Sequence, residues 1–482
     1  GNTILEAENY ANIEMGKIAS WARDNKTRFN EQKSKTMLIT RRKRRENKEI
    51  HIFLNNKKLE QVNTMKYLGI VIDNRFTFTQ HIDYVTERCT KLINALSKTA
   101  KISWGLSHKA LWTIYNGAVL PLLSYAVPVW ISALNKGFIV NKLKRIQRLI
   151  CIRIAKDYRT VSYESLCVLT GLTPKHLKLQ EIATIHQVKK MNKYENQNVD
   201  LPIGYKGWTH PAKFMEIQEI KESVNYTYEI FTDGSKSERG VGSGIAIFKK
   251  EELIQQMKYK LNNNCSNNQA EQLAIIKALE SITRHNTRDE PVDNRKVAIY
   301  TDSQITLDSL RNANNHNSLI EGIREQLKAA EDDNWLVEFG WVKAHVGIFG
   351  NELADRLAKQ AASDNDLNIC YNRIPISAVK KQLAAISEEK WEMEWATTTN
   401  GATTKSYFPR ISEYPIGINS NNPDGGADFH RFNSKDSAVC VCGNGYQTVD
   451  HIIYDCVKLQ IERKTLIDVV NRTGGKWPID KS

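Results

Sequence analysis

Negative charge is missing from a long stretch of this sequence. No aspartate or glutamate occurs between Glu87 and Asp157, whereas twelve lysines and arginines do. Residues 1–226 carry a net charge of +18 and the remainder −4, within a total of +14. A surface that approaches phosphates excludes carboxylates in this way, because each one would oppose binding. The charge pattern favours nucleic acid as a partner, and the alternative is a basic protein kept soluble by its charge.

Cysteine is too sparse for a disulfide framework, with eight residues among 482. Five of them are scattered, which is typical of thiols in a reducing compartment. These five are Cys89, Cys151, Cys167, Cys265 and Cys370. A signal peptide is also missing, so we expect an intracellular protein of the nucleus or cytoplasm that is not secreted. The chain opens on Gly1 instead of Met, which suggests a fragment of a longer protein.

One stretch lacks all charge and is long enough to be compared with a membrane span. It runs from Ala110 to Asn135, but Pro121 and Pro128 interrupt it and polar residues are mixed in. We therefore expect buried helices and a turn there, without any contact with a membrane.

The patterns along the chain divide it into five regions, and no internal repeat is visible. Short strands are expected in 1–78, helices in 79–191, a polar linker in 192–226, a compact α/β domain in 227–365 and a tail in 366–482. The basic cluster Arg41–Arg45 lies between two strand-like runs. It could be a nuclear address, a phosphate contact or a plain solvated loop.

Carboxylates fall at special places in the α/β region. Five strands are expected, at 228–233, 245–248, 253–260, 297–301 and 336–342. Asp233 and Asp302 each end an apolar strand directly before a turn, whereas Glu271 and Asp355 lie near the starts of helices. In one twisted sheet these positions can converge and bring four carboxylates together.

Four carboxylates at one place stay ionised only if cations neutralise them. Hard divalent ions with oxygen ligands, Mg²⁺ above all, suit such a set. Two such ions can hold the attacking and leaving oxygens of a phosphodiester. Each residue alone has an ordinary explanation, since Asp-Gly is typical of a turn and Glu stabilises a helix start. The prediction rests on the combination.

The ordered motifs identify a family. Between Glu229 and Ala362, the motifs Thr232–Ser235, Asn267–Glu271, Tyr300–Gln304 and His345–Asp355 resemble the ribonuclease H family at its diagnostic positions. The resemblance implies a mixed five-stranded sheet with flanking helices. It also implies that Asp233, Glu271, Asp302 and Asp355 bind two Mg²⁺ or Mn²⁺ ions, with His345 assisting proton movement or product release.

The same resemblance implies cleavage of the RNA strand of an RNA–DNA hybrid, leaving 5′-phosphate and 3′-hydroxyl ends. The 2′-hydroxyl in the minor groove would mark the strand to be cut. The residues implied to contact nucleic acid are Asn267, Asn268, Gln269, Ser303, Gln304 and Asn351.

The N-terminal part of the chain, positions 1–190, resembles the end of a reverse transcriptase from a jockey/I-like non-LTR retrotransposon. The resemblance rests on Asn30–Thr36, Tyr67–Asp73 with His81, and the segments Tyr125–Trp130 and Leu143–Ile152. It implies the last part of a palm in 1–78 and a helical thumb or connection in 79–191. No Tyr-x-Asp-Asp or Phe-x-Asp-Asp pair occurs, so no polymerase activity is expected. Element RNA and target DNA are the implied partners.

The last cysteines resemble the knuckle that closes many such elements. Cys440, Cys442, His451 and Cys456 suit one structural, tetrahedral Zn²⁺ ion. The Cys-x-Cys spacing is tighter than usual, and the alternative is free cysteines in a helical hairpin.

The sequence thus predicts a ribonuclease H within a retrotransposon polyprotein fragment. The first rival is an inactive nucleic-acid-binding remnant of a truncated element. The second is a transposase or integrase of the same fold, which would have other carboxylate spacings and lack the His345 loop.

Overall fold

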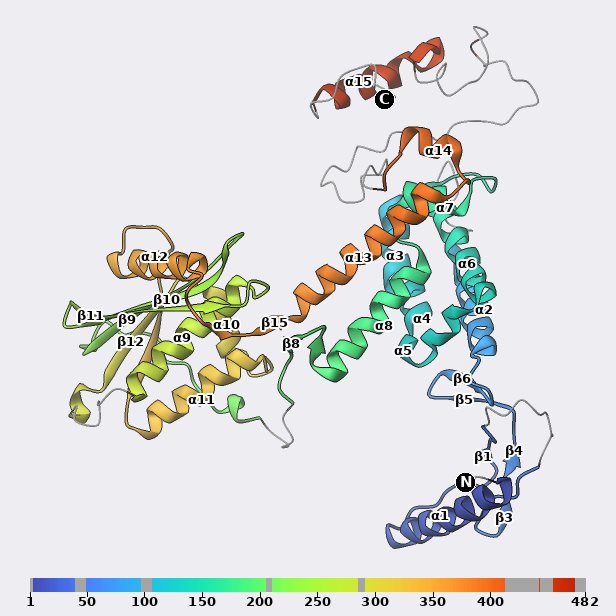
Figure 1. Cartoon of the computed structure of the whole chain (residues 1–482), viewed down its shortest axis with the longest axis horizontal. Helices are drawn as coiled ribbons and strands as arrows, with labels where there is room; N and C mark the ends of the chain where they lie inside the picture. The colour runs from blue at the N-terminus through green and yellow to red at the C-terminus, as the bar shows by residue number, and fades with distance from the viewer. Residues whose placement is uncertain are drawn as a thin grey trace. The chain divides into compact units, whose positions relative to one another are not determined.

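The structure is a computed structural model that describes residues 3–39, 49–96, 106–204, 210–284, 291–411, 442 and 454–472. Its contacts divide the chain into two compact units (Figure 1). Unit 1 comprises Gly1–Ala183 with Ile386–Ser482, and unit 2 comprises Thr184–Ala385. The basic cluster Arg41–Arg45 lies outside the described residues.

Unit 1 begins with a helix and short strand pairs. Helix α1 (Ile4–Asp24) starts at a capping box in which Thr3 and Glu6 bond each other's backbone N–H. The strands are β1 (Lys35–Thr36), β2 (Phe53–Leu54), β3 (Lys57–Lys58), β4 (Glu60–Gln61), β5 (Thr64–Tyr67) and β6 (Ile70–Asp73). They pair as β1–β4, β2–β3 and β5–β6.

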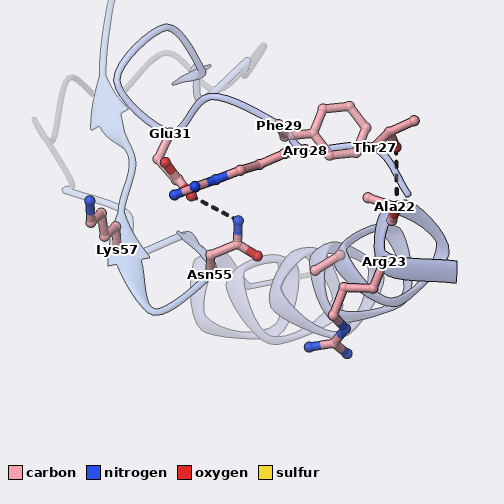
Figure 2. A pocket seen from close by; sticks show the side chains of 9 residues that line it. Ala22, Arg23, Thr27, Arg28, Phe29, Glu31, Asn55 and Lys57 are labelled. Carbon is pink, nitrogen blue, oxygen red and sulfur yellow. Dashed lines mark hydrogen bonds between the residues drawn. The ribbon is translucent and has the colours of Figure 1, made fainter. Parts of the chain in front are cut away.

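A cavity of about 370 Å³ lies beside the end of α1 (Figure 2). Arg23, Arg28 and Lys57 line it together with Phe29. The carboxylate among its lining residues, Glu31, accepts a hydrogen bond of 2.8 Å from the amide of Asn55. Cations therefore outnumber carboxylates around this hollow, in keeping with the positive charge of the N-terminal part of the chain.

The rest of unit 1 is helical, as predicted for 79–191. Its helices are α2 (Thr79–Leu96), α3 (His108–Ile114), α4 (Leu120–Ser124), α5 (Val127–Trp130), α6 (Gly137–Ala155), α7 (Tyr163–Thr170), the first part of α8 (Lys175–Met191), the last part of α13 (Ile376–Thr397), α14 (Ala402–Tyr407) and α15 (Gln460–Arg472). Trp391 and Trp395 of α13 are buried against Tyr163 and Cys167 of α7. A segment far along the chain therefore completes the core of this unit.

The uncharged stretch forms buried helices and a turn, as predicted. Leu111, Tyr115, Leu123 and Trp130 are at most 2% exposed and share one core. Among the described residues no single helix is long and apolar enough to cross a membrane. One pair of segments, His108–Ser124 and Val127–Asn135, meets the length and composition criteria together but is bent by 46°.

Unit 2 is built on a mixed sheet with the order β13-β12-β9-β10-β11-β14. Its strands are β9 (Tyr228–Ser237), β10 (Gly240–Lys249), β11 (Glu252–Leu261), β12 (Lys296–Thr301), β13 (Leu336–Trp341) and β14 (Ile369–Tyr371). The strands β9, β10 and β11 are antiparallel neighbours, whereas β12 runs parallel to both β9 and β13. The five predicted strands are present, but the prediction of a five-stranded sheet is wrong because β14 adds a sixth, parallel to β11.

Helices cover both faces of this sheet, because successive side chains of a strand point to opposite faces. Ile230, Ile245 and Ile247 face a core shared with α9 (Asn267–Arg284), α10 (Gln304–Arg311) and α11 (Ser318–Asp332). Phe231, Ala246 and Phe248 face α12 (Phe349–Ser363). In Figure 1, α12 lies on one side of the sheet and α9 and α11 lie on the other.

The segment expected to be a linker, 192–226, contains ordered strands. In it β7 (Lys193–Tyr194) and β8 (Gln197–Asp200) form a three-stranded sheet with β15 (Arg373–Pro375), in the order β15-β8-β7. Val199 of β8 and Ile374 of β15 are buried in a small core with Val188 and Val379. Strands of two to four residues are too short to show an alternating pattern, so periodicity could not reveal them.

Adding one methyl group at Gly244 is expected to destabilise unit 2. In Gly244→Ala the new Cβ would lie 2.1 Å from the carbonyl oxygen of Ala354 in α12. Helix and sheet must then move apart, and overpacking of this kind costs about 1–3 kcal/mol or more. Urea unfolding, followed by hydrogen exchange of β9–β11, measures the loss.

Gly322→Ala in α11 is the matched control. Its Cβ would meet only the flexible tip of Ile276, at 3.1 Å, and alanine favours helix by about 1 kcal/mol over glycine. An unchanged free energy of unfolding for Gly244→Ala would contradict the close approach of α12 to β10.

Candidate active site

Asp233 and Asp302 lie on, or directly after, the neighbouring parallel strands β9 and β12. Asp302 directly follows Thr301, the last residue of β12, as predicted. Asp233 lies within β9 instead of at its end, because β9 continues to Ser237 and pairs Asp233 with Gly244. The residues before and after Asp233 both pair with β10, so the sheet fixes the backbone of this aspartate.

Asp233 projects toward the face covered by α12. Phe231 and Tyr300 stack there, with ring centroids 4.8 Å apart, and Phe231 packs against α12 residues. Asp233 lies two positions further along β9, so it shares that face, and Asp302 directly follows the neighbouring strand β12. Asp355 of α12 belongs to it as well, and the negative charge of Asp355 acts on both aspartates.

Glu271 comes from α9, on the opposite face. Its helix touches β9 at Gly234, where an added Cβ would lie 2.4 Å from the backbone nitrogen of Glu271. A glycine at this position lets the first turn of α9 come close enough for Glu271 to join the aspartates. The carboxylate accepts hydrogen bonds from Asn267, at 2.6 Å, and from Ser303.

Burial and mutual repulsion perturb these carboxyl groups. Burial first, then the charges of Asp302, Asp355 and Glu271, together raise the pKa of Asp233 to about 8, against the lowering effect of the Gly234 N–H. Burial and the charge of Asp302 raise the pKa of Glu271, against the hydrogen bonds from Ser303 and Asn267. The pKa of Asp302 is also raised, by burial first and by Asp355.

The donor set fits a hard divalent ion. It consists of carboxylate oxygens, which Mg²⁺ and Mn²⁺ prefer, and cations would relieve the repulsion that raises the pKa values. Within the described part of the chain, the cation bonded to this set is Lys359, which donates to Asp355 at 2.7 Å and is itself 59% exposed. His345 lies on the exposed loop before α12 with a left-handed backbone (φ 55°), and its charge favours ionisation of Asp302.

The residues expected to contact nucleic acid fall into two groups. Asn267, Asn268 and Gln304 are exposed. Ser303, Gln269 and Asn351 are buried. Ser303 caps α10 by accepting from the N–H of Thr306.

Gln269 and Asn351 differ from each other. Asn351 is 3% exposed, and its Oδ1 has no hydrogen-bond partner among the described residues. Both ends of the Gln269 amide are occupied, because Oε1 accepts from the N–H of Ser266 and Nε2 donates to Asp200. Gln269 is therefore held by protein partners here, and its contact with nucleic acid stays a prediction.

Asp200 was missed in the sequence analysis, because it lies in the expected linker. It is 6% exposed and accepts hydrogen bonds from Gln269 (2.7 Å), Ser318 and Tyr371. These donors come from the first turns of α9 and α11 and from β14. Asp200 thereby fixes the start of α9, two residues before Glu271. A lone aspartate in a polar segment carries no sequence signal for this role.

The predicted zinc ligands are only partly described. Cys442 is half-buried and Cys456 is buried, whereas Cys440 and His451 lie outside the described residues. Their assembly into one site stays a prediction.

Comparisons with known proteins agree with this geometry. The family model for RNase H matches residues 225–363. A ribonuclease H of Campylobacter jejuni is 31% identical over 146 residues, which cover 28% of this chain and 90% of that protein. The chain belongs to the ribonuclease H family. The range matched by the family model, 225–363, includes all four carboxylates and His345.

Other relatives place this ribonuclease H domain in a larger setting. Two Pol polyproteins of type-1 retrotransposable elements in Nasonia vitripennis, R1 4 and R1 2, are 32% and 27% identical over 160 and 196 residues. These matches cover 33% and 39% of this chain and 40% and 47% of the relatives. The chain thus combines a ribonuclease H domain with similarity to non-LTR retrotransposon proteins, and it spans less than half of each of these two relatives.

Without divalent ions, unit 2 is expected to lose stability as the pH rises. The pKa of an aspartate is about 3.9 in an unfolded chain, whereas that of Asp233 is about 8 in the fold. The folded state keeps a proton that the unfolded state has released, so stability is full below about pH 4 and is lost up to about pH 8. Asp233→Asn should flatten this dependence, because the amide does not titrate.

The midpoint of urea unfolding, measured from about pH 5 to about pH 9, tests this loss. Excess Mg²⁺ should restore the midpoint of the wild type at the alkaline end. Coincident pH curves for the wild type and Asp233→Asn would show that Asp233 is not perturbed.

Asp200→Ala is expected to impair both stability and metal binding. It leaves three donors without their acceptor, which costs about 2–5 kcal/mol. It also frees the turn of α9 that carries Glu271, so half-maximal hybrid cleavage should require several-fold more Mg²⁺. Asp366→Ala, at an exposed aspartate of the same unit, is the control. A lower stability with an unchanged Mg²⁺ requirement would limit Asp200 to a structural role.

Proposed function

We propose that this domain hydrolyses the RNA strand of RNA–DNA hybrids with two Mg²⁺ or Mn²⁺ ions. The observation that supports the proposal best is the convergence of four carboxylates from β9, the end of β12, α9 and α12. The pKa values of three of them, Asp233, Glu271 and Asp302, are raised. Two bound ions would activate a water and stabilise the leaving oxygen of the scissile phosphodiester.

The side chains of the chain supply the rest of the proposed mechanism. Asp233, buried and centred in β9, holds the position of the site relative to the sheet. His345, exposed on its loop, can accept or deliver a proton as product leaves, because an imidazole nitrogen can act as donor or acceptor. Asn267 is exposed and bonded to Glu271, so a contact with the 2′-hydroxyl there would be transmitted to the metal-binding carboxylate.

We further propose that unit 1 binds nucleic acid for this domain. Helix α6 contributes five cations and no carboxylate, and its described surface includes Lys142, Lys144 and Arg145. Element RNA and target DNA are the proposed ligands, which would place the protein in the nucleus or cytoplasm. Polymerisation is not proposed, since Asp73 is occupied as an acceptor for the N–H groups of Arg75, Thr77 and Phe78.

An inactive remnant remains the rival function. A decaying site would be expected to lose carboxylates first, because nothing but metal binding requires like charges to be buried together. All four are present here. The proposed Zn²⁺ site at Cys440, Cys442, His451 and Cys456 rests on the sequence alone.

Asp302→Asn tests the proposal directly. The variant should cut a labelled RNA–DNA hybrid at least about a hundredfold more slowly, because one metal-binding charge is worth several kcal/mol of transition-state stabilisation. Binding of the hybrid should be retained. Gel analysis of the RNA strand should show 5′-phosphate and 3′-hydroxyl ends in the wild type.

Asp332→Asn, at the exposed end of α11, should cleave at the wild-type rate. Wild-type protein that binds the hybrid without cutting it in Mg²⁺ or Mn²⁺ would favour the inactive remnant.

A further inference from the structure

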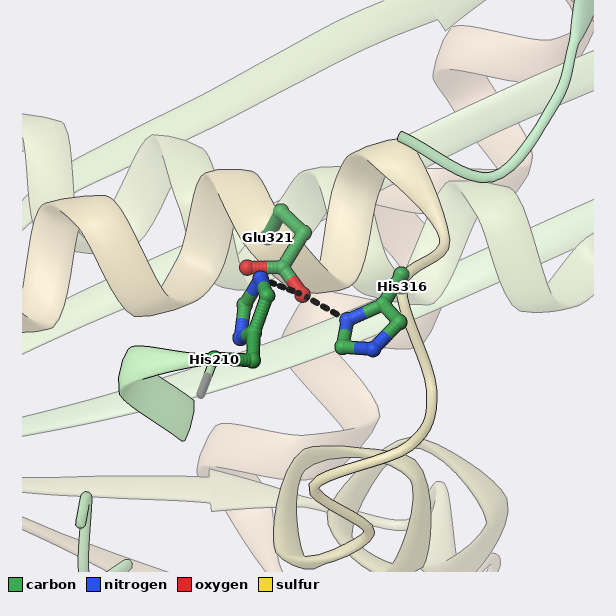
Figure 3. A group of neighbouring side chains, drawn as sticks. All are labelled: His210, His316 and Glu321. Atoms are coloured by element: carbon green, nitrogen blue, oxygen red, sulfur yellow. Dashed lines mark hydrogen bonds and ion pairs between the residues drawn. The ribbon is translucent and has the colours of Figure 1, made fainter. Parts of the chain in front are cut away.

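A second group of potential metal ligands lies in unit 2, apart from the carboxylates of the proposed catalytic site. His210 precedes a short turn at Pro211–Lys213, His316 lies just before α11, and Glu321 lies in its first turn. The donor atoms of all three lie within 4.8 Å of one another. Figure 3 shows both imidazole rings turned toward the carboxylate of Glu321.

The spacing of these atoms suits a small tetrahedral ion. Nδ1 of His316 lies 3.0 Å from Oε1 of Glu321, and Nε2 of His210 lies 3.7 Å from the same oxygen. Ligands at zinc distances of about 2.0–2.1 Å in tetrahedral geometry are about 3.3 Å apart. The two observed distances bracket this value, and the longer one exceeds an ordinary hydrogen bond.

Arg324 holds the carboxylate in place from behind. Its guanidinium is 4% exposed and donates to Oε1 of Glu321 at 2.7 Å. Its two terminal nitrogens also donate to backbone carbonyls of residues 310, 312 and 315. A carboxylate oxygen has two lone pairs: one serves Arg324, and the other, now hydrogen-bonded to Nδ1 of His316 at 3.0 Å, would serve the ion instead. Such outer hydrogen bonds orient the ligands of protein metal sites.

We propose that His210, His316 and Glu321 bind one Zn²⁺ ion. Two imidazoles favour Zn²⁺ over Mg²⁺, which prefers oxygen ligands. Three protein ligands leave the fourth position of the tetrahedron to water. The ion would fasten the segment around His210, which precedes the matched domain, to the start of α11.

Binding of the ion carries a cost, because it breaks a hydrogen bond of His210. Nδ1 of His210 accepts from the N–H of Ala212 at 3.2 Å, so in the neutral ring the proton lies on Nε2. A metal at Nε2 moves that proton to Nδ1 and breaks this hydrogen bond.

Calorimetric titration of the full chain with Zn²⁺ tests the proposal. Cys440→Ser and Cys442→Ser are introduced to remove the other predicted zinc site, and excess Mg²⁺ occupies the carboxylates. One equivalent of Zn²⁺ should bind at about pH 7.5, and His210→Gln and His316→Gln should each weaken binding at least about tenfold. Co²⁺ should give the visible absorption of a tetrahedral nitrogen and oxygen site.

His186→Gln, at an exposed histidine of α8 in the same unit, is the control and should bind Zn²⁺ normally. Hybrid cleavage in Mg²⁺ reports that each variant is folded. Binding of no Zn²⁺, or binding that both substitutions leave unchanged, would overturn the proposal and show a hydrogen-bonded cluster only.

Discussion

Repulsion among buried carboxylates is the constraint on which the rest of unit 2 depends. Asp233 is 6% exposed and Glu271 is 8% exposed, and an ionised carboxylate is more stable in water than in such a place. They stay buried because β9 and α9, on which they lie, are fixed firmly in the fold. The sheet ladder fixes Asp233 on β9, and the core beneath α9 fixes Glu271. The fold therefore holds the carboxylates close together, and bound protons or cations relieve their mutual repulsion.

Close backbone contacts make this arrangement possible. Gly234 lets α9 approach β9, and Gly242 and Gly244 let α12 approach β10. These glycines fix how far the two helices stand from the sheet, and hence how near their carboxylates come to Asp233. The flanking strands add a second restraint, because Asp200 of β8 ties down the start of α9. The structure that supports the carboxylates therefore includes residues outside 225–363, the range that the family model matches.

Much of this could be predicted from the sequence. The five central strands have apolar runs of ordinary length, and the four carboxylates stand at motifs with fixed spacing. Asp302 at the end of β12 is where the pattern placed it. The helical nature of 79–191 followed from amphipathic periodicity such as that of α6.

The remaining features left no local signal. Strands β7, β8, β14 and β15 have two to four residues, and the pairings β8–β15 and β11–β14 join segments far apart along the chain. The extent of β9 beyond Asp233 depends on pairing with β10, which an Asp-Gly pair alone does not reveal. Gln269 stands in a family motif, yet its contacts come from Asp200 and Arg373, both outside that motif. The cluster of His210, His316 and Glu321 forms only in three dimensions.

The proton balance of metal binding tests the central claim most directly. Titration of the chain with Mn²⁺, by calorimetry in buffers of different ionisation enthalpy, gives the number of protons released. A carboxyl group with a pKa of about 8, as for Asp233, is mostly protonated at pH 7. The account predicts release of roughly one proton near pH 7 and far less above about pH 9. Metal binding without proton release at pH 7 would show that the carboxylates are already ionised and would contradict the account.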